Sequence, residues 1–323
     1  MGKDFRGHWI YWIDMGIVII RQDGKIGIWK EAIQKLAPSI PVYGYLDKHP
    51  KEAIKMALVW KPPMGVFDQY PGIECIASSG AGVDFLFEDK RLPTNIPITR
   101  VVDEFLAKDM SEHVIALIFG HLKNLNQYKN DQFNRIWKPL EYHRIKDFKI
   151  GIMGLGALGI VLANDLLHFG FSVQGWSNSK KQLADIPAYA GENELSEFLK
   201  STDILVCLLP LTKKTNGILN KRLFEQLPIG AHVINVARGG HLVDEDLIAM
   251  IDKGHLSGAS LDVFHQEPLD TSHPFWAHSK IHMTPHYASV SDTNSVVPQI
   301  VDNYNRLLKG SALLNLVSKS EGY

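Results

Sequence analysis

The amino-acid sequence predicts the α/β class, with two domains that are each built on a doubly wound parallel sheet. Short strand-like runs alternate with helical stretches along the chain, a pattern typical of parallel sheets covered by helices on both faces. Runs such as DILVCLLP at 203–210 are apolar at successive positions, as expected for strands buried on both faces. The length of 323 residues leaves room for two domains of about 150 residues each.

The expected elements follow one another with short connections. Helices are expected at 29–37 and 162–170, and a longer helix at about 110–129 separates the early strands from the later ones. A polar, aromatic segment with Trp137 and Tyr142 follows this long helix, and we expect the domain boundary just before the helix. The expected strands cover residues 17–20, 57–60, 73–79, 148–153, 171–176, 203–210, 231–237, 258–263 and 280–285.

Composition excludes several classes of protein. The 34 Lys and Arg residues nearly balance 35 Asp and Glu residues, so no broad basic surface for nucleic acid or anionic membrane is expected. No apolar run approaches the roughly 20 residues of a membrane span. Cys75 and Cys207 lie in apolar strand-like runs and are expected to be buried thiols in the cytoplasm. Residues 1–14 lack the features of a signal peptide, and we expect them to be a dispensable extension.

The strand expected at 148–153 leads directly into a glycine-rich loop and then a helix. Its three glycines have the G-x-G-x-x-G spacing, which allows a tight turn, close approach of the backbone to a pyrophosphate, and close packing of the helix. The phosphates would then lie at the amino terminus of the helix. The predicted dinucleotide contacts of this loop are Gly154, Leu155, Gly156, Ala157, Leu158 and Gly159.

The next expected strand ends at Ser177, where an acidic residue usually accepts hydrogen bonds from the adenosine ribose. Asn178, Ser179, Lys180 and Lys181 follow, and small hydroxyls with cations suit a 2′-phosphate. This favours NADP(H) over NAD(H), and the alternative is a solvated lysine pair.

Three later segments combine an apolar strand with polar residues at its end. They are INVARGG with Arg238, LDVFHQEPL with Asp262 and Glu267, and MTPHYAS with His286. In an open α/β sheet such strand ends face the ligand crevice. Taken with the glycine loop and SGAGVD at 79–84, these segments resemble the D-isomer-specific 2-hydroxyacid dehydrogenase family.

The resemblance extends from about Ile17 to the end of the chain. WKPP at 60–63, WKPLEYH at 137–143 and the terminal GY are similar to the branch that reduces glyoxylate and hydroxypyruvate. The resemblance implies two Rossmann-like domains. These are a discontinuous flavodoxin-like substrate domain at 1–104 and 290–323, and a dinucleotide-binding domain at 105–289, with the active site in the cleft between them. It also implies a homodimer that uses the long helix and the segment after it.

The resemblance implies specific roles for the polar residues. His286 would be the general acid and base, with Glu267 as its partner, and imidazole chemistry near neutrality suits that task. Arg238 would bind the substrate carboxylate with its planar fork of donors. Asp262 would accept a hydrogen bond from the nicotinamide carboxamide. The resemblance also implies further cofactor contacts at Leu209, Pro210, Thr215, Val236, Ala237 and Ala288.

Substrate contacts are expected in the first part of the chain. The resemblance implies that the backbone amides of Gly80, Ala81 and Gly82 receive the carboxylate, although a plain turn is the alternative. Trp60 and Trp137 are expected to wall the pocket, or Trp137 to lie at a subunit contact, unless these large aromatics belong to the core.

A metal site is not expected. His278, His282 and His286 recur every four residues, but Pro285 prevents a continuous helix, and no cysteine or carboxylate cluster completes a ligand set.

The expected reaction is NADPH-dependent reduction of glyoxylate to glycolate and of hydroxypyruvate to D-glycerate. The alternatives are another D-2-hydroxyacid dehydrogenase, of the D-lactate, phosphoglycerate or formate type, or a dinucleotide-sensing module without catalysis. Formate chemistry needs no pair like His286 and Glu267, and too few residues follow His286 for the added domain of many phosphoglycerate enzymes.

Overall fold

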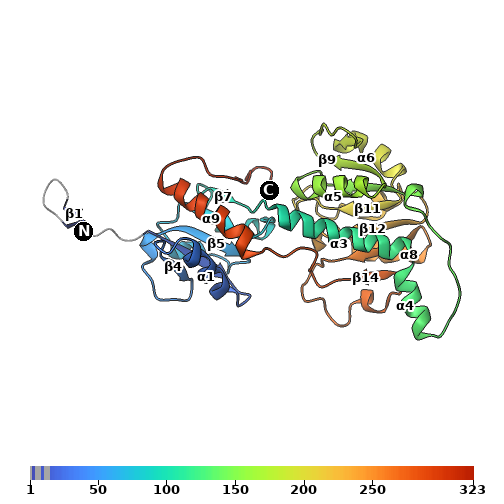
Figure 1. Ribbon diagram of the computed structural model, residues 1–323, viewed down its shortest axis with the longest axis horizontal. Helices are drawn as coiled ribbons and strands as arrows, with labels where there is room; N and C mark the ends of the chain where they lie inside the picture. The colour runs from blue at the N-terminus through green and yellow to red at the C-terminus, as the bar shows by residue number, and fades with distance from the viewer. Residues whose placement is uncertain (1, 4–8, 11–14) are drawn as a thin grey trace. The chain divides into compact units, whose positions relative to one another are not determined.

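The structure is a computed structural model that describes residues 2–3, 9–10 and 15–323. The chain divides into two compact units: unit 1 comprises Met1–Asp103 and Ser291–Tyr323, and unit 2 comprises Glu104–Val290 (Figure 1). Near the amino terminus, β1 (Gly2–Lys3) and β2 (Trp9–Ile10) pair antiparallel. The rest of the extension expected at 1–14 lies outside the described residues.

Unit 1 is built on a five-stranded sheet whose order is β4-β3-β5-β6-β7, and all of its strand pairs are parallel. Counted along the chain, this order is 2-1-3-4-5, which is the flavodoxin-like arrangement that was predicted. The elements are β3 (Gly16–Arg21), α1 (Ile26–Leu36), β4 (Val42–Gly44), η1 (Lys51–Ala53), β5 (Ile54–Trp60), η2 (Val66–Gln69), β6 (Cys75–Ser78), α2 (Asp84–Phe87), β7 (Ile98–Thr99) and α9 (Thr293–Leu308).

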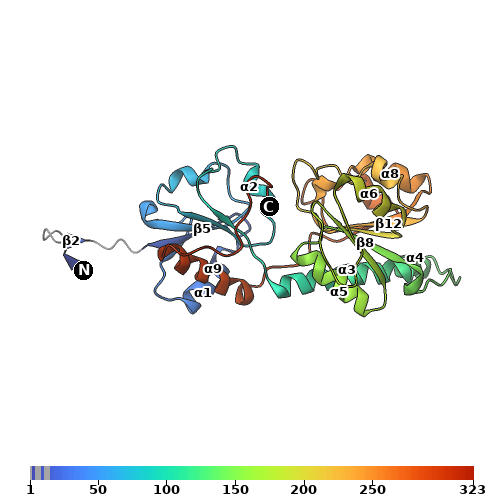
Figure 2. The same cartoon turned by 90° about the horizontal axis from the view of Figure 1, so that it is seen from above.

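Both faces of the sheet in unit 1 are covered, which explains why β3 is apolar at successive positions. Ile17 and Ile19 pack in one buried cluster with residues of α1 and α9, whereas Val18 and Ile20 pack in another with residues of η2 and α2. Figure 2 shows α1 and α9 together on one face of this sheet. The carboxy-terminal helix therefore completes a domain that the amino-terminal strands begin.

Unit 2 is built on a seven-stranded parallel sheet of order β10-β9-β8-β11-β12-β13-β14. Counted from β8, the order is 3-2-1-4-5-6-7, the Rossmann order with one further strand, so the predicted fold class is confirmed for this unit too. Its strands are β8 (Lys149–Met153), β9 (Ser172–Ser177), β10 (Ala188–Ala190), β11 (Ile204–Cys207), β12 (Ala231–Asn235), β13 (Leu256–Leu261) and β14 (Ile281–Met283). Its helices are α3 (Glu104–Leu122), α4 (Leu125–Phe133), η3 (Ile145–Asp147), α5 (Ala157–His168), α6 (Gly191–Lys200), α7 (Lys221–Phe224), η4 (Gly239–His241), α8 (Asp244–Asp252) and η5 (Pro274–Ala277).

The prediction of a single long helix at about 110–129 is wrong. The structure has two helices, α3 and α4, because Asn124 adopts the left-handed conformation with φ 54° between them. Asparagine tolerates this conformation better than other residues with a Cβ atom. The following segment returns along α4, since the hydroxyl of Tyr128 accepts from the Leu140 amide (2.9 Å) and Nδ2 of Asn124 donates to the carbonyl of Glu141 (3.2 Å).

Both cysteines are free and buried, as predicted, and burial raises the pKa of each thiol to about 12. Among the described residues, no helix combines the length and the apolar character that crossing a membrane requires.

Candidate active site

The loop between β8 and α5 in unit 2 has the geometry of a dinucleotide-binding turn. Gly154 has φ 112°, and a Cβ atom on Gly159 would lie 1.9 Å from the carbonyl oxygen of Gly154, so only glycine fits at either position. Gly156 is exposed, and a Cβ atom there would meet nothing within 4 Å. The loop therefore leaves open space at the amino terminus of a 12-residue helix, where a pyrophosphate fits.

The other predicted residues of this loop differ in their environment. Ala157 is exposed and Leu158 is partly buried, whereas Leu155 is only 2% exposed. The Leu155 side chain packs so closely on Gly175 of β9 that a Cβ atom there would lie 2.4 Å from it. Only the backbone of Leu155 is thus placed for a ligand.

The end of β9 is organised by its own side chains. Ser177 is buried, and its Oγ donates to the carbonyl of Ser179 (2.8 Å). Asn178 and Ser179 are exposed. Nζ of Lys180 donates to both carboxylate oxygens of Glu194, at 3.0 and 2.7 Å. This hydrogen bond, with a further one from the Ala190 amide, lowers the pKa of Glu194.

The further predicted cofactor residues follow the carboxyl ends of neighbouring strands, at the same edge as the glycine loop, because parallel strands all end at one edge of a sheet. Thr215 shapes one of these segments: its Oγ1 donates to the carbonyl of Pro210 (2.7 Å) and accepts from the Thr212 amide (2.9 Å). The apolar residues are buried, so only their backbone atoms would be available to a ligand; they are Leu209, Val236, Ala237 and Ala288.

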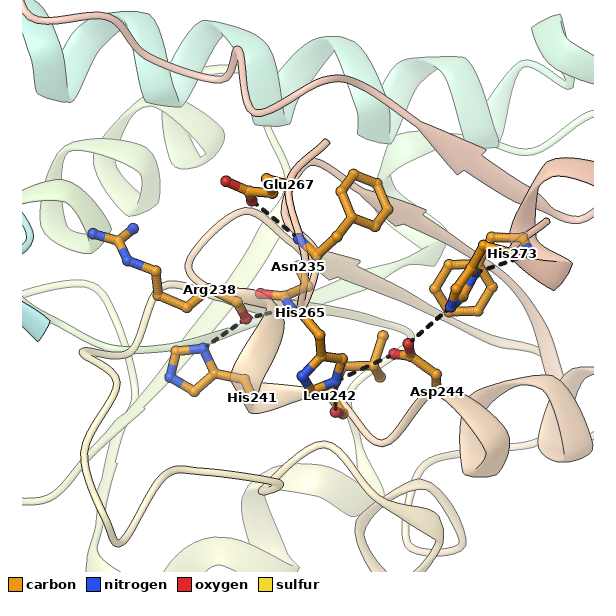
Figure 3. A network of polar contacts seen from close by, with 10 residues as sticks. Asn235, Arg238, His241, Leu242, Asp244, His265, Glu267 and His273 are labelled. Atoms are coloured by element: carbon orange, nitrogen blue, oxygen red, sulfur yellow. Dashed lines mark hydrogen bonds and ion pairs between the residues drawn. The ribbon is translucent and has the colours of Figure 1, made fainter. Parts of the chain in front are cut away.

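Arg238 follows β12 and has extended backbone. Its carbonyl oxygen accepts from Nδ2 of Asn235 (2.9 Å) and lies 3.1 Å from Nδ1 of His241, as Figure 3 shows. Nη1 of Arg238 donates to the carbonyl of Ala237 (2.6 Å). The backbone that carries this guanidinium is therefore held from two sides.

Asp262 follows β13 and is fully buried. Its Oδ1 accepts from Oγ1 of Thr284 (2.6 Å) and from the Tyr287 amide (2.8 Å), and its Oδ2 accepts from the Ala288 amide (2.9 Å). A buried carboxylate needs such donors to offset its lost hydration. Asp262 thus holds the loop that carries His286, and its expected role as an acceptor for the nicotinamide carboxamide stays a prediction.

His286 and Glu267 lie in contact. Nδ1 of His286 is 2.8 Å from Oε2 of Glu267, and both side chains are partly exposed, at 30% and 23%. Oε1 of Glu267 also accepts from the Phe264 amide (3.2 Å). His286 has φ 51°, and its amide donates to the carbonyl of Asp262 (2.8 Å). With Nδ1 directed at a carboxylate, Nε2 is the ring nitrogen that can exchange a proton with a ligand.

The three histidines with four-residue spacing lie in different surroundings. Nε2 of His278 is 3.3 Å from Oδ1 of Asp252, His282 lies on β14, and His286 belongs to the pair with Glu267. Within residues 2–3, 9–10 and 15–323, no group of three or more His, Cys, Asp or Glu side chains could hold a metal ion.

In unit 1, the loop after β6 is closely packed. Oγ of Ser78 accepts from the Gly80 amide (3.2 Å) and donates to the Gly82 carbonyl (3.0 Å). The Gly80 amide therefore has a hydrogen-bond partner within its own loop, and the expected contact of Gly80, Ala81 and Gly82 with a carboxylate stays a prediction. A Cβ atom on Gly80 would lie 2.6 Å from the ring of Trp60, so this ring lies directly against the loop.

The two tryptophans are placed differently. Trp60 is partly buried and makes an edge-on contact with Phe85, with ring centroids 5.4 Å apart. Trp137 is 98% exposed, so the alternative that it belongs to the core is wrong.

Comparison with known proteins decides the family. Residues 115–288 match the family model described as D-isomer specific 2-hydroxyacid dehydrogenase, NAD binding domain. The chain belongs to the D-isomer specific 2-hydroxyacid dehydrogenase family. The match covers more than half of the chain and contains the glycine loop, Arg238, Asp262, Glu267 and His286.

Whole-length relatives of this dehydrogenase agree. Glyoxylate/hydroxypyruvate reductase A of Photorhabdus laumondii is 38% identical over 300 residues, which cover 91% of this chain and 96% of the relative. A D-isomer specific 2-hydroxyacid dehydrogenase of Xanthobacter autotrophicus, solved with NADPH and MES, superimposes with a TM-score of 0.91 at 34% identity and covers 96% of this chain and 100% of its own. The NADPH-dependent glyoxylate/hydroxypyruvate reductase of Sinorhizobium meliloti, solved with NADP and sulfate, has a TM-score of 0.88 at 34% identity, with coverage of 95% and 100%.

Sequence reasoning missed two carboxylates of this dehydrogenase. Asp244, at the start of α8, lies 3.6 Å from Nε2 of His265 and 3.3 Å from Nε2 of His273, and these histidines flank Glu267 in the chain (Figure 3). Burial raises the pKa of Asp244. The second is Glu194, the partner of Lys180. Both lie in the first turn of a helix, where an acidic residue is common, so neither had a distinguishing signal in the sequence.

Proposed function

We propose that this dehydrogenase reduces the small 2-oxo acids glyoxylate and hydroxypyruvate with NADPH, and that unit 2 binds the cofactor while unit 1 binds part of the substrate. The observation that carries the proposal is the contact between His286 and Glu267 in the same unit as an open dinucleotide-binding loop. The relatives named for these two reductions, and the related structures solved with NADP or NADPH, support the choice of substrates and cofactor.

The residues of unit 2 suit a dinucleotide. The amides at the start of α5 and the space at Gly156 would take the pyrophosphate. The turn formed by Ser177, Asn178, Ser179 and Lys180 would take the 2′-phosphate of the adenosine. When bound, the reduced nicotinamide supplies the hydride that the carbonyl carbon of the substrate receives.

His286 would act as the general acid and base. As negative charge develops on the carbonyl oxygen of the substrate, Nε2 of the imidazolium donates a proton to that oxygen, which completes the hydroxyl group. The Glu267 carboxylate at Nδ1 orients the ring and stabilises its charged form until the proton is transferred. In the reverse direction the same nitrogen accepts the proton of the hydroxyl group.

Substrate binding is proposed for Arg238 and for unit 1. The planar guanidinium of Arg238 would pair with the substrate carboxylate and polarise the ketone. In unit 1, the amides of Ala81 and Gly82 would receive the carboxylate, and Trp60 would limit the size of the substrate's side group. Two small substrates are consistent with a bulky ring packed against that loop.

We also propose a homodimer. α4 and the segment after it expose a group of large apolar side chains, which on a monomer would face water. These are Leu125, Tyr128, Phe133, Ile136, Trp137 and Tyr142, and their exposed fractions run from 38% to 98%.

The two free thiols suit a reducing compartment, so we place the protein in the cytoplasm.

A steady-state assay tests the reaction. The oxidation of NADPH and of NADH is followed separately with glyoxylate, hydroxypyruvate and pyruvate. The proposal requires turnover with the first two substrates and a preference for NADPH. A preference for NADH would be consistent with the proposed reduction but would contradict the proposed preference for NADPH. Absence of turnover with every substrate, with tight dinucleotide binding retained, would favour a sensing module.

A further inference from the structure

An ion pair lies at the end of β9, at the place proposed for the adenosine ribose. Nζ of Lys180 contacts both oxygens of Glu194, and the two side chains are 57% and 38% exposed. An acidic side chain of α6 thus contacts the turn that follows β9.

The fold holds this carboxylate firmly. β10 pairs with β9 so that Ala190 is opposite Ser177, and Oε2 of Glu194 accepts from the amide of Ala190 (2.7 Å). Nε1 of Trp176 donates to the carbonyl of Gly191 (2.9 Å), which ties the first turn of α6 to the same end of β9. Glu194 is thus positioned by the sheet, whereas Lys180 reaches it from a turn.

We propose that Glu194 is a specificity-determining residue, whose carboxylate holds Lys180 at the ribose and weakens binding of any cofactor that carries a 2′-phosphate. The proposal rests on the proposed function, since it concerns the same cofactor site. It adds a residue that limits the preference for NADPH rather than creating it.

The charges of Lys180 and Glu194 predict how each substitution changes the relative affinity for a 2′-phosphate and a 2′-hydroxyl. Lys180 and Glu194 together have no net charge, so a 2′-phosphate gains attraction from the first and repulsion from the second. A ribose 2′-hydroxyl has no charge and can donate a hydrogen bond to the carboxylate of Glu194. Removing the charge of Glu194 should therefore favour the phosphate, and removing the charge of Lys180 should favour the hydroxyl. An exposed ion pair contributes little to stability, so either change should leave the fold intact.

The test measures binding of two fragments by isothermal titration calorimetry with the full chain. Adenosine 2′,5′-bisphosphate carries the 2′-phosphate, and adenosine 5′-monophosphate lacks it. The variants are Glu194→Gln, which can still accept from the Ala190 amide, and Lys180→Met. Glu225→Gln is the matched control, because Glu225 forms an exposed ion pair with Lys221 (3.9 Å) in the same unit.

For Glu194→Gln we expect the ratio of bisphosphate to monophosphate affinity to rise about threefold to tenfold at low ionic strength, and less at high salt. For Lys180→Met the ratio should fall by about fivefold or more, while the control should match the wild type. A change below about twofold in Glu194→Gln, or an equal change in the control, would overturn the inference, and so would an unchanged ratio in Lys180→Met.

The two proposals fail separately in this design. The ratio of the wild type tests the proposed preference for NADPH, because a chain that binds both fragments equally has no such preference. The change of the ratio on substitution tests the role of Glu194 in either case. Steady-state kcat/KM with NADPH and NADH should move in the same direction as the binding ratio.

Discussion

Nδ1 of His286 lies 2.8 Å from Oε2 of Glu267, across a separation of 19 residues in the chain. Each residue comes from a different loop at the carboxyl edge of the sheet in unit 2. Their contact gives the imidazole one fixed hydrogen-bond acceptor, which decides which ring nitrogen is available for chemistry.

Removing the imidazole should abolish proton transfer and leave cofactor binding nearly unchanged. For His286→Ala we expect kcat to fall about 10²- to 10⁴-fold. For Glu267→Gln we expect a smaller loss, since the ring stays but its charged form loses a partner. Steady-state kinetics, with NADPH affinity measured by fluorescence titration, would check both. Wild-type turnover in His286→Ala would refute the assignment.

Two substitutions of Arg238 should distinguish the contribution of its positive charge to catalysis from that of its planar shape. Arg238→Ala is expected to raise the KM for the 2-oxo acid and lower kcat, because the carboxylate and the developing oxyanion both lose a partner. Arg238→Lys should recover only part of the loss, since a lysine ammonium lacks the planar fork. Full recovery in Arg238→Lys would show that the charge alone is needed.

Asp262 should act on activity through the loop that it holds. Asp262→Asn places an amide group against the Tyr287 and Ala288 amides, so we expect unfolding free energy to fall by about 1–3 kcal/mol and kcat to fall with it. Thr284→Val removes one donor to the carboxylate and should give a smaller loss of both. Denaturant titration and kinetics measure the two effects. Normal stability and turnover in Asp262→Asn would contradict the role.

Two glycines in helices should respond oppositely to alanine. Gly159→Ala would place a methyl group on the Gly154 carbonyl, so the loop must shift, and we expect NADPH binding to weaken at least about tenfold. At Gly120 in α3 the same methyl group meets nothing within 4 Å, and Gly120→Ala should stabilise the protein by about 0.5–1 kcal/mol. Equal cofactor affinity in the two variants would exclude the steric explanation.

Acid should destabilise unit 2 through one buried imidazole, that of His232, and two partly buried ones, those of His121 and His282. The rings of His121 and His232 stack with centroids 3.9 Å apart, and burial lowers the pKa of His121 to about 4, that of His232 well below its usual value, and that of His282. Between the usual pKa of about 6.5 and the folded value, the unfolded chain binds protons that the folded chain does not. Stability should therefore fall as the pH falls through this range, by about 2 kcal/mol from His121 alone between pH 7 and 5.

The measurement is the free energy of unfolding in urea at pH 7, 6 and 5 for the wild type and His121→Gln. The variant has no imidazole at 121 to protonate, so its stability should depend less steeply on pH. Parallel pH dependences would show that His121 does not contribute.

Local patterns were sufficient for the long strands and the glycine loop. β3, β8 and β11 are short runs of apolar residues that only a doubly covered sheet can bury, and the spacing of Gly154, Gly156 and Gly159 suits only a turn into a helix. The short strands β4, β7 and β10, of two or three residues each, were not predicted, because so short a segment has no period of its own. The break at Asn124 was also missed, since nearby residues favour helix on both sides.

By itself the sequence determined the fold class, the family to which the chain is similar and the residue types of the proposed site, because each depends on neighbours in the chain or on a motif in order. Only the tertiary structure decided which charges meet. Glu194 reaches Lys180 because β10 pairs with β9, and Asp262 accepts hydrogen bonds from the loop that carries His286. Hydrogen bonds between side chains form across strands and loops, so their partners depend on register and packing that no local pattern contains.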